Sequence, residues 1–542
     1  MSQIFEFFLD KDKQSLISFF SVEYMIILLP MVFILVGITP KRYKRYTLLA
    51  LSYLYYWWIS RKLIVVLIGT TLIMYFAGLF IEKIYGNRDK LLQNAEKSQK
   101  KEIRSKFNKK SGMILVLSIS MLVLSIVVFK YLGFFTRNLN YLLKGIDSGF
   151  RLKIPRLMVP IGISFFTLQS ISYLVDVKRE VIKADHNIFR LALFISYFPQ
   201  IVEGPICRYA DTASQLWNVT SYDKKNLKYG AMRYLYGIFK KIVIADRLNI
   251  IVSKVFNKYD KYSGWILLVG IIAYTIQLYM DFSGSMDAVL GTSEMLGIRL
   301  TENFRRPLFS RSISEFWTRW HISLGTWFKD YIFYPITMSS SMKKLTSNAR
   351  KKIGNHFGPL LAGGVALFCV WLLNGLWHGA GWTFIAFGMY HFILIYTASL
   401  LLPFTNNILT KLKINTSNKY FKIMQIIRTF FLVVIGELFF RAPNIRVALS
   451  MIKRIFTKFY MPTSKPFYSI METPDIVISI ISILIVFCIS LALERGVNIR
   501  DRIFETNIVY RWIIIYAIIL FIIIFGAYGY GYTPIDPMYA NY

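Results

Sequence analysis

Long runs of apolar residues recur along the chain and are separated by short polar or basic segments. The clearest runs are MIILLPMVFILVGI (25–38), MILVLSISMLVLSIVVF (113–129), IVISIISILIVFCISLAL (476–493) and WIIIYAIILFIIIF (512–525). A helix rises about 1.5 Å per residue, so about 20 apolar residues cross a hydrocarbon layer of roughly 30 Å. These runs are too many and too long for the buried core helices of a soluble protein. We therefore expect an all-α polytopic membrane protein.

The same pattern predicts spans along most of the chain. The predicted spans are 17–38, 46–59, 62–81, 112–134, 154–175, 188–206, 229–252, 263–283, 359–375, 380–402, 426–440, 474–494 and 510–528. Lys and Arg collect in loops on the cytoplasmic side of a membrane. We therefore place the most basic long loop, 82–110, in the cytoplasm. This choice puts the N- and C-termini and a short segment, 441–473, on the extracytoplasmic side.

Charge adds to this picture without changing the class of protein. The chain carries 65 Lys and Arg against 30 Asp and Glu, a formal net charge of +35, and 55% of its residues are hydrophobic. The basic residues are spread over loops between apolar spans, which indicates membrane orientation and argues against a nucleic-acid partner. The start, MSQIFEFFLDKDKQ, lacks a basic n-region and a small-residue cleavage site, so no removed signal peptide is expected.

The count of crossings fails in the middle of the chain, between 188 and 336. Either 188–206 or 229–252 is re-entrant, or 315–336 crosses the membrane. The first of these runs into EGPICRY, and the second contains the adjacent charges Lys240 and Lys241. Irregular backbone survives at membrane depth only where protein or trapped water satisfies it. We therefore expect interrupted helices around a shaped interior.

The segment 281–336 is polar, aromatic and charged, unlike the rest of the chain. Its part 312–335 is predicted to be helical and mixes tryptophans with Arg319, His321 and Asp330. One interpretation is an interfacial helix, because Trp, Arg and Lys suit the headgroup region. The other is a buried segment whose ionisable groups line a polar cavity. The residues alone leave both open.

His378 lies in NGLWHGAGWTF (374–384), within an apolar stretch from about 359 to 402. That stretch is too long for one crossing and fits two helices joined by a tight break. Gly375, Gly379 and Gly381 permit backbone conformations that other residues resist. Burial favours the neutral imidazole, which can accept a proton as a general base does. A structural histidine that ties two helix ends together is an equally good interpretation at this point.

The sequence gives little support for other kinds of functional site. Cys207, Cys369 and Cys488 show no CxxC spacing, and no HExxH, GxSxG or GxxxxGK[ST] motif occurs, so no disulfide framework and no metal are expected. His391 lies within a predicted span, where a hydrogen bond across helices is its expected role. Acidic residues near spans would suit a transporter or flippase, but no repeat relates the two halves of the chain.

Four stretches resemble the membrane-bound O-acyltransferase (MBOAT) family. They are VPIGISFFTLQSISYLVDVKR (159–179), EGPICRY (203–209), the whole of 281–336, and NGLWHGAGWTFIAFGMYH (374–391). The match is closest to the bacterial branch typified by the alginate O-acetylation proteins, with the D-alanyl transfer proteins as cousins. It covers a core of about 159–391 within what we expect to be a single membrane-embedded domain, 1–542. Outside that core the resemblance rests on hydropathy and length.

The resemblance implies a fold of interrupted helices around a transmembrane tunnel, and acyl transfer as the reaction. His378 matches the family's catalytic histidine and His321 its second histidine. The donor would be acetyl-CoA or an acyl-carrier thioester used as a substrate, with no bound cofactor. Further residues expected to line the tunnel or contact substrate are Asn374, Trp377, Trp320, Arg319 and Asp330.

The resemblance also implies a setting for the reaction. The protein would lie in the lipid of the bacterial plasma membrane, and an extracellular polysaccharide would be the final acceptor. Because 441–473 is too short for a soluble domain, an extracytoplasmic partner protein of the acetyl-transfer or esterase-like kind would complete the transfer. D-alanyl transfer to teichoic acid is the alternative activity.

Overall fold

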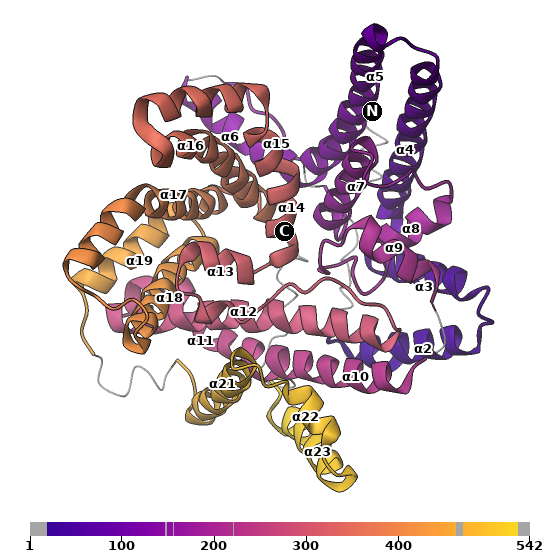
Figure 1. The fold of residues 1–542 in the computed structure, drawn as a ribbon. Helices are drawn as coiled ribbons and strands as arrows, with labels where there is room; N and C mark the ends of the chain where they lie inside the picture. Colours follow the sequence, from indigo (N-terminus) through magenta and orange to yellow (C-terminus); the bar gives the residue numbers. More distant parts are fainter. Residues whose placement is uncertain (1–18, 147–148, 156, 220–221, 462–469, 529–542) are drawn as a thin grey trace. The chain divides into compact units, whose positions relative to one another are not determined.

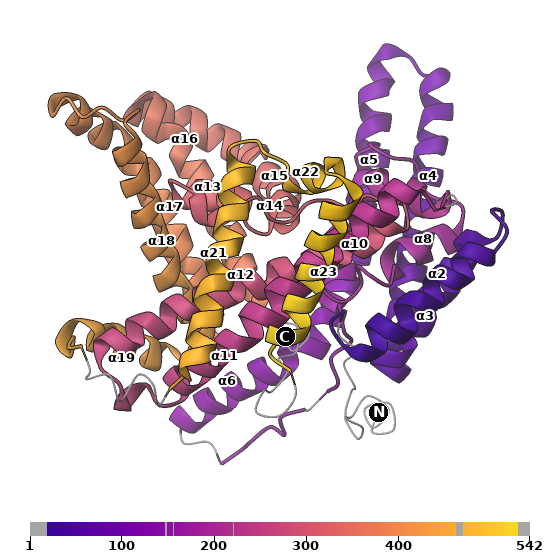
Figure 2. The same ribbon diagram turned by 90° about the horizontal axis from the view of Figure 1, so that it is seen from below.

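In a computed structural model, the structure describes residues 19–146, 149–155, 157–219, 222–461 and 470–528. The regular structure of these residues is helical, apart from one isolated antiparallel bridge between Phe304 and Trp320. The described chain divides into two compact units, shown in Figures 1 and 2. One unit comprises residues up to 230 together with 292–301, and the other comprises 231–291 together with 302–528.

The first unit contains the N-terminal helices. They are η1 (Glu23–Leu28), α2 (Leu29–Ile38), α3 (Lys44–Ser60), η2 (Arg61–Leu63), α4 (Ile64–Gln93), α5 (Lys97–Ile126), η3 (Val127–Tyr131), α6 (Leu132–Gly145), α7 (Ile163–Lys178), α8 (Ile188–Ser196), α9 (Tyr209–Trp217) and the start of α10 (Lys224–Ile238). Almost every residue of α7 is buried, so this helix forms the core of the unit.

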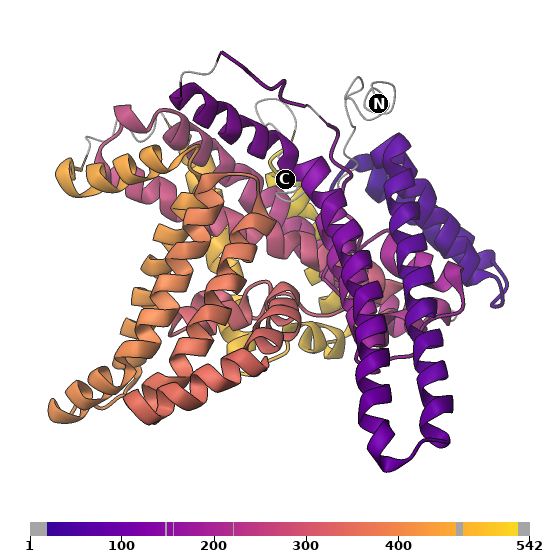
Figure 3. The same ribbon diagram turned by 90° about the horizontal axis from the view of Figure 1, so that it is seen from above.

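The basic segment 82–110 is not a loop. Figure 3 shows α4 and α5 as two long antiparallel helices, and only 94–96 separate them. More than half of the segment is Lys, Arg, Glu, Gln or Leu, which are strong helix formers, so both helices continue past their apolar parts. The basic segment 342–352 is likewise helical, because it lies within α16 (Ser340–His378). Hydropathy marks the apolar part of a helix and misses such extensions.

The predicted span 188–206 is also interrupted, as the sequence suggested. Its helical part, α8, is only nine residues long, and Asn187 caps it by accepting from the backbone N–H groups of Phe189 and Arg190. The non-helical stretch 197–207 that follows is buried throughout. Neither this segment nor 229–252 is among the helices long and apolar enough to cross a membrane. The segment is therefore irregular backbone enclosed by protein, which is the arrangement that a bilayer interior requires.

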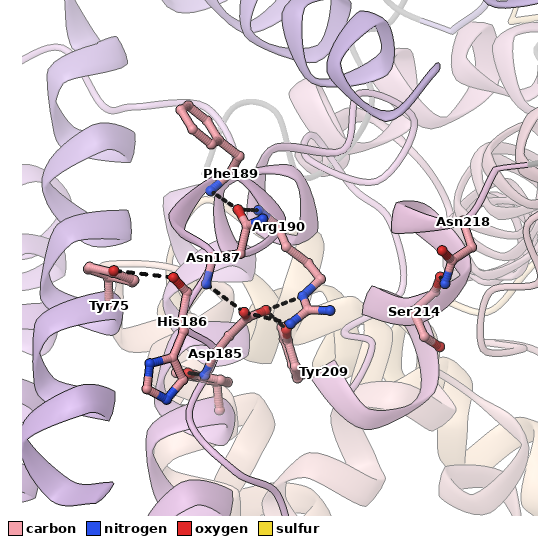
Figure 4. Close-up of polar contacts among 10 residues, drawn as sticks. Tyr75, Asp185, His186, Asn187, Phe189, Arg190, Tyr209, Ser214 and Asn218 are labelled. Carbon is pink, nitrogen blue, oxygen red and sulfur yellow. Dashed lines mark hydrogen bonds and ion pairs between the residues drawn. The ribbon is translucent and has the colours of Figure 1, made fainter. Parts of the chain in front are cut away.

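The buried carboxylate of Asp185 fixes this interrupted region (Figure 4). It accepts from Arg190 Nη2 at 2.7 Å, from the backbone N–H of Asn187 at 2.8 Å and from the hydroxyl of Tyr209 on α9. Burial opposes its ionisation, but the hydrogen bonds from Arg190 and Tyr209 hold the pKa of this carboxyl below its usual range. Asp185 thereby joins α8 to α9.

Replacing Asp185 with Asn should destabilise the first unit. Hydrogen bonds to charged groups contribute about 1.5–3 kcal/mol each, and the variant would weaken several of them at once. We expect a lower apparent melting temperature for the detergent-solubilised protein, measured by the loss of its monodisperse chromatography peak after heating. Asp211→Asn, on the exposed face of α9, is the matched control and should have the same apparent melting temperature as the wild type. Equal melting of Asp185→Asn and wild type would show that the carboxylate does not hold α8 and α9 together.

The second unit contains the remaining helices. They are the end of α10, η4 (Phe239–Ala245), α11 (Asp246–Asn257), η5 (Tyr259–Lys261), α12 (Gly264–Met295), η6 (Pro307–Phe309), α13 (Ile313–Arg319), α14 (Ile322–Phe328), η7 (Lys329–Phe333), α15 (Tyr334–Thr337), α16 (Ser340–His378), α17 (Trp382–Lys411), α18 (Lys419–Arg441), α19 (Ile445–Thr457), α21 (Thr473–Glu494), α22 (Ile499–Glu505) and α23 (Ile508–Phe525).

Eight candidate spans occur among the described residues of the whole chain. They are 44–93, 97–145, 264–295, 340–378, 382–411, 419–441, 473–494 and 508–525. The remaining predicted spans are short or broken helices. The predicted helix 312–335 is among the broken segments, because it divides into α13, α14, η7 and α15.

The two lysines in the predicted span 229–252 are paired with carboxylates, chiefly of α12. Lys241 lies 2.8 Å from carboxylate oxygens of both Asp246 and Asp281, and Lys240 lies 2.6 Å from Asp287. Both lysines belong to η4, a π-helical turn in the middle of the α10–α11 segment. Buried charges are tolerated when they are paired in this way. The pairing explains why lysines stand in an otherwise apolar segment.

Candidate active site

His378 is the last residue of α16, at the break that the glycines predict. Gly379 is extended (φ 179°) and α17 begins three residues later, at Trp382. The two helices approach closely, since a Cβ on Gly388 would lie 2.3 Å from the carbonyl oxygen of Trp371. The side chain of His378 is buried, with its residue only 3% exposed. The break thus places an imidazole inside the second unit and away from its outer surface.

Aromatic side chains surround the His378 ring. Its centroid lies 4.9 Å from that of Trp377, 5.0 Å from Phe440 on α18 and 5.8 Å from Phe387 on α17, all edge-on. Asn374 lies one turn earlier on α16 and is also buried. Its amide oxygen has no hydrogen-bond partner among the described residues. An apolar wall with a buried amide beside it offers one polar contact to a bound group in otherwise apolar surroundings.

His321 lies where the predicted helix 312–335 breaks. The chain turns back at Trp320, which forms the isolated bridge with Phe304, and His321 itself adopts a left-handed conformation (φ 47°). The backbone N–H of Ile322 donates to the carbonyl oxygen of Asn303 at 3.0 Å. A non-glycine residue at positive φ is uncommon, and such strain collects at functional sites. The break depends on a distant residue, Asn303, which is why helical propensity did not reveal it.

Asn303 also determines which nitrogen of His321 carries the proton. The backbone N–H of Ser323 donates to Asn303 Oδ1 at 3.0 Å, which fixes that atom as an acceptor. His321 Nδ1 lies 3.3 Å from the same oxygen and must therefore donate to it. Burial lowers the pKa of His321 to about 3, so the ring is neutral at physiological pH. Nε2 therefore carries the lone pair.

Trp377 packs against both histidines. Its ring centroid is 5.3 Å from that of His321 and 4.9 Å from that of His378. His321 comes from the polar segment 281–336 and His378 from the glycine-rich break after α16. These two parts are far apart in sequence, yet both histidines contact the same indole. This arrangement supports the interpretation of 281–336 as a buried segment whose polar groups face an interior site.

The structure places three other predicted site residues, Trp320, Arg319 and Asp330, in different surroundings. Trp320 is buried, and its ring stacks on that of Phe316 with the centroids 5.4 Å apart. Arg319 instead points toward carboxylates, 2.8 Å from Glu315 and 3.1 Å from Glu494 at the end of α21. Asp330 lies in η7 and is half-buried. Contact of Arg319 and Asp330 with substrate therefore remains a prediction.

One residue of the site was not singled out from the sequence, and one expected contact is confirmed. Asn303 was missed, although it stands in the polar segment TENFRR. His391 does make the expected hydrogen bond across helices, because Trp317 Nε1 on α13 donates to its Nδ1 on α17 at 3.2 Å. His391 also stacks on Trp371 of α16, with ring centroids 5.3 Å apart. It therefore ties the segment before His321 to the helix pair that carries His378.

Comparison with known proteins identifies the family. The family model described as "MBOAT, membrane-bound O-acyltransferase family" matches residues 48–350, which include His321 and end before His378. The chain is 32% identical over 441 residues to "Probable alginate O-acetylase AlgI" of Pseudomonas aeruginosa, an alignment that covers 81% of this chain and 75% of that protein.

Two further relatives carry other names. The chain is 28% identical over 436 residues to the "Peptidoglycan O-acetyltransferase" of Helicobacter pylori, covering 76% of this chain and 73% of that protein. It is 29% identical over 282 residues to the "Teichoic acid D-alanyltransferase" of Bacillus subtilis, covering 51% and 67%. The chain therefore belongs to the membrane-bound O-acyltransferase family and is a multi-pass O-acyltransferase.

Proposed function

We propose that this protein transfers an acetyl group from a cytoplasmic thioester, with acetyl-CoA as the donor, toward hydroxyl groups of an extracellular polysaccharide. The observation that carries the proposal is that the rings of His321 and His378 both pack against Trp377. Both rings are buried, and His321 holds its lone pair on Nε2. Two buried imidazoles in an enclosed site suit proton transfer from an alcohol.

In the proposed reaction, His378 takes the proton of the acceptor hydroxyl while its oxygen attacks the thioester carbonyl carbon. A carbon–oxygen bond forms and the carbon–sulfur bond breaks. The leaving thiolate then receives the proton from the imidazolium of His378, so the products are an ester and a free thiol. Direct transfer of this kind needs no metal ion and no acyl-protein intermediate.

The remaining site residues would position the reactants. His321 Nε2 accepts a hydrogen bond from a hydroxyl of the acceptor and so orients it. The buried amide of Asn374, one turn from His378, offers its NH₂ group to the thioester carbonyl oxygen, where negative charge develops. Trp377 contacts both histidines and would give the acyl group an apolar wall. Arg319, Trp320 and Asp330 would line the approach to this centre.

The membrane orientation follows from charge. The connection 412–418 between α17 and α18 is flanked by basic residues, as is the helical tip of α4 and α5. We place both on the cytoplasmic side of the bacterial plasma membrane, with the donor entering from there through a tunnel. The segment 441–473 then lies outside with both chain ends, although 1–18, 462–469 and 529–542 fall outside the described residues.

The nature of the relatives favours acetyl over D-alanyl transfer. The alginate O-acetylase aligns with 81% of this chain, whereas the teichoic acid D-alanyltransferase aligns with 51%. Two relatives are named for the O-acetylation of alginate and of peptidoglycan, which supports a glycan acceptor. Family membership also favours an enzyme over a transporter or flippase. An extracytoplasmic esterase-like partner would complete the transfer, because 441–473 is too short for such a domain.

The donor can be tested with purified protein in liposomes. We offer acetyl-CoA labelled in its acetyl group, or a carrier protein loaded with D-alanine, and measure both release of the free thiol and label in an added oligosaccharide. Acetyl-CoA should release CoA and label the acceptor, and the D-alanyl carrier should do neither. Turnover with the D-alanyl carrier alone would reverse the assignment. Movement of solute without thiol release would indicate a transporter.

A further inference from the structure

His391 lies at a point where four helices of the second unit meet (Figure 1). The residue belongs to α17 and is fully buried. Its ring stacks on that of Trp371 of α16 with the centroids 5.3 Å apart, and lies nearly perpendicular to that of Trp317 of α13 at 5.0 Å. The fourth helix, α18, approaches at Gly436, where a Cβ would lie only 2.6 Å from His391 Nε2.

One hydrogen bond fixes the direction of this ring. The indole N–H of Trp317 can only donate, and it donates to His391 Nδ1 at 3.2 Å. Nδ1 therefore holds the lone pair, and in the neutral ring the proton is on Nε2. Nε2 is buried and has no hydrogen-bond partner among the described residues. The ring thus makes one hydrogen bond and leaves its donor unmatched.

Packing alone does not explain a histidine at this position. An unmatched buried donor costs about 1–3 kcal/mol, and a phenylalanine would fill a similar volume without that cost. Replacing both members of a buried hydrogen bond by apolar groups of the same shape is nearly neutral for stability. Apolar packing loses its unique arrangement before it loses stability. The bond between Trp317 and His391 therefore contributes a fixed position more than it contributes free energy.

α13 is the element that this bond holds in place. It has only seven residues (Ile313–Arg319), too few for a helix to be stable by itself, so its position depends on its neighbours. Trp317 lies in α13, four residues before His321. The bonds from Asn303 hold the turn at His321. The bond from Trp317 to His391 instead attaches α13 itself to α17.

α17 is in turn packed against the helix that ends at His378. Phe387, one turn before His391, contacts both imidazoles, with its centroid 4.8 Å from that of His391 and 5.8 Å from that of His378. The indole of Trp371 stacks on His391 from α16, the helix that carries His378. His391 and His378 therefore belong to one packed pair of helices. A segment bonded to His391 is placed relative to His378.

We propose that His391 is a positioning residue for acyl transfer. Through Trp317 it sets where His321 lies relative to His378, and it does not contact substrate itself. The inference rests on the proposed function, in which those two histidines serve one reaction. A displacement of about 1 Å can lower a rate about 10²-fold, so loss of the bond should reduce kcat. The KM for the donor should be unchanged, because neither His391 nor Trp317 binds the donor.

The test removes the donor and the acceptor of this bond together. The double variant Trp317→Phe and His391→Phe keeps an aromatic ring at both positions and leaves no unmatched polar atom. Its apparent melting temperature should therefore stay near that of the wild type. Its kcat for acetyl transfer should fall about tenfold or more, with the KM for acetyl-CoA within about twofold. His391→Asn keeps an acceptor oxygen about where Nδ1 lies and should stay within about threefold of wild-type kcat.

Tyr390→Phe is the matched control. The hydroxyl of Tyr390 donates to the carbonyl oxygen of Leu432 at 2.9 Å, and the ring lies 5.2 Å from that of His391. This variant therefore removes a hydrogen bond between α17 and α18 beside His391 and leaves α13 unchanged, so kcat should be normal. Gly436→Ala is an independent variant. Its methyl group would displace the His391 ring and should lower kcat as the double variant does.

The bond can also be observed without any substrate. In protein made with isotope-labelled tryptophan, the indole N–H resonance of Trp317 is identified by its absence from Trp317→Phe. The resonance should shift in His391→Phe and in Gly436→Ala. It should stay close to its wild-type position in His391→Asn and in Tyr390→Phe. These shifts report whether His391 holds the indole, independently of turnover.

Two results would overturn the inference. One is a stable double variant with wild-type kcat. The other is a loss of kcat in Tyr390→Phe as large as in the double variant, which would indicate general packing. If the double variant is unstable, normal turnover by Gly436→Ala with a shifted indole resonance gives the same negative answer. A wild-type protein that transfers no acetyl group would instead refute the proposed function.

Discussion

Replacing His378 with alanine will lower the rate of acetyl transfer by about 10²–10⁴-fold, the usual contribution of a general base. The ring is buried at the helix break and surrounded by Trp377, Phe387 and Phe440, so no solvent-exposed group can take its place. The effect should appear in kcat, measured as release of CoA by purified protein with saturating donor and acceptor.

Folding has to be separated from catalysis in this experiment. His378→Gln retains polar character and part of the volume between Trp377 and Phe440, and should be equally inactive while remaining monodisperse in detergent. His186→Ala is the matched control, because its imidazole is 73% exposed and lies in the first unit. Normal turnover by a folded His378→Ala protein would show that the imidazole of His378 is not the general base.

The second large effect is expected from Asn303→Asp. The carboxylate would lie about where Asn303 Oδ1 now lies, 3.3 Å from Nδ1 of His321, and would favour the imidazolium. The pKa of His321, now lowered to about 3 by burial, would therefore rise. A protonated ring has no lone pair on Nε2 and cannot accept the hydrogen bond that orients the acceptor.

The sign of the pH dependence follows from that change. Wild-type His321 stays neutral at all pH values well above 3, so it contributes no protonation step near neutral pH. In Asn303→Asp, activity should be reduced about tenfold or more below the raised pKa and should recover as the pH increases through it. The measurement is kcat against pH for both proteins. A uniform loss at every pH, without a shifted limb, would assign Asn303 a structural role alone.

The sequence predicted the class of fold well because hydropathy is a local property. The apolar runs at 113–129, 476–493 and 512–525 all lie in helices long enough to span a membrane. The break after His378 could also be predicted, because the three glycines that allow it lie close to the histidine in sequence. In contrast, the polarity of 82–110 predicts a loop and hides the high helical propensity of its residues.

Long-range contacts account for what could not be predicted. The helix 312–335 breaks at His321 because Asn303, in another segment, supplies both a backbone carbonyl and a side-chain oxygen to the turn. No periodicity within 312–335 encodes that partner. The same holds for the indole of Trp317 that donates to His391. These features arise only when separate helices pack together.

The ion pairs between η4 and α12 have a consequence for how the protein enters the membrane. Lys240 and Lys241 precede Asp281 and Asp287 in synthesis, and a lone charged residue at the centre of an inserting helix costs about 2.5–3.5 kcal/mol. Neither segment is therefore easily released into lipid by itself. We expect the α10–α11 segment to stay inside the forming protein until α12 emerges, when Asp281 and Asp287 can pair with its lysines.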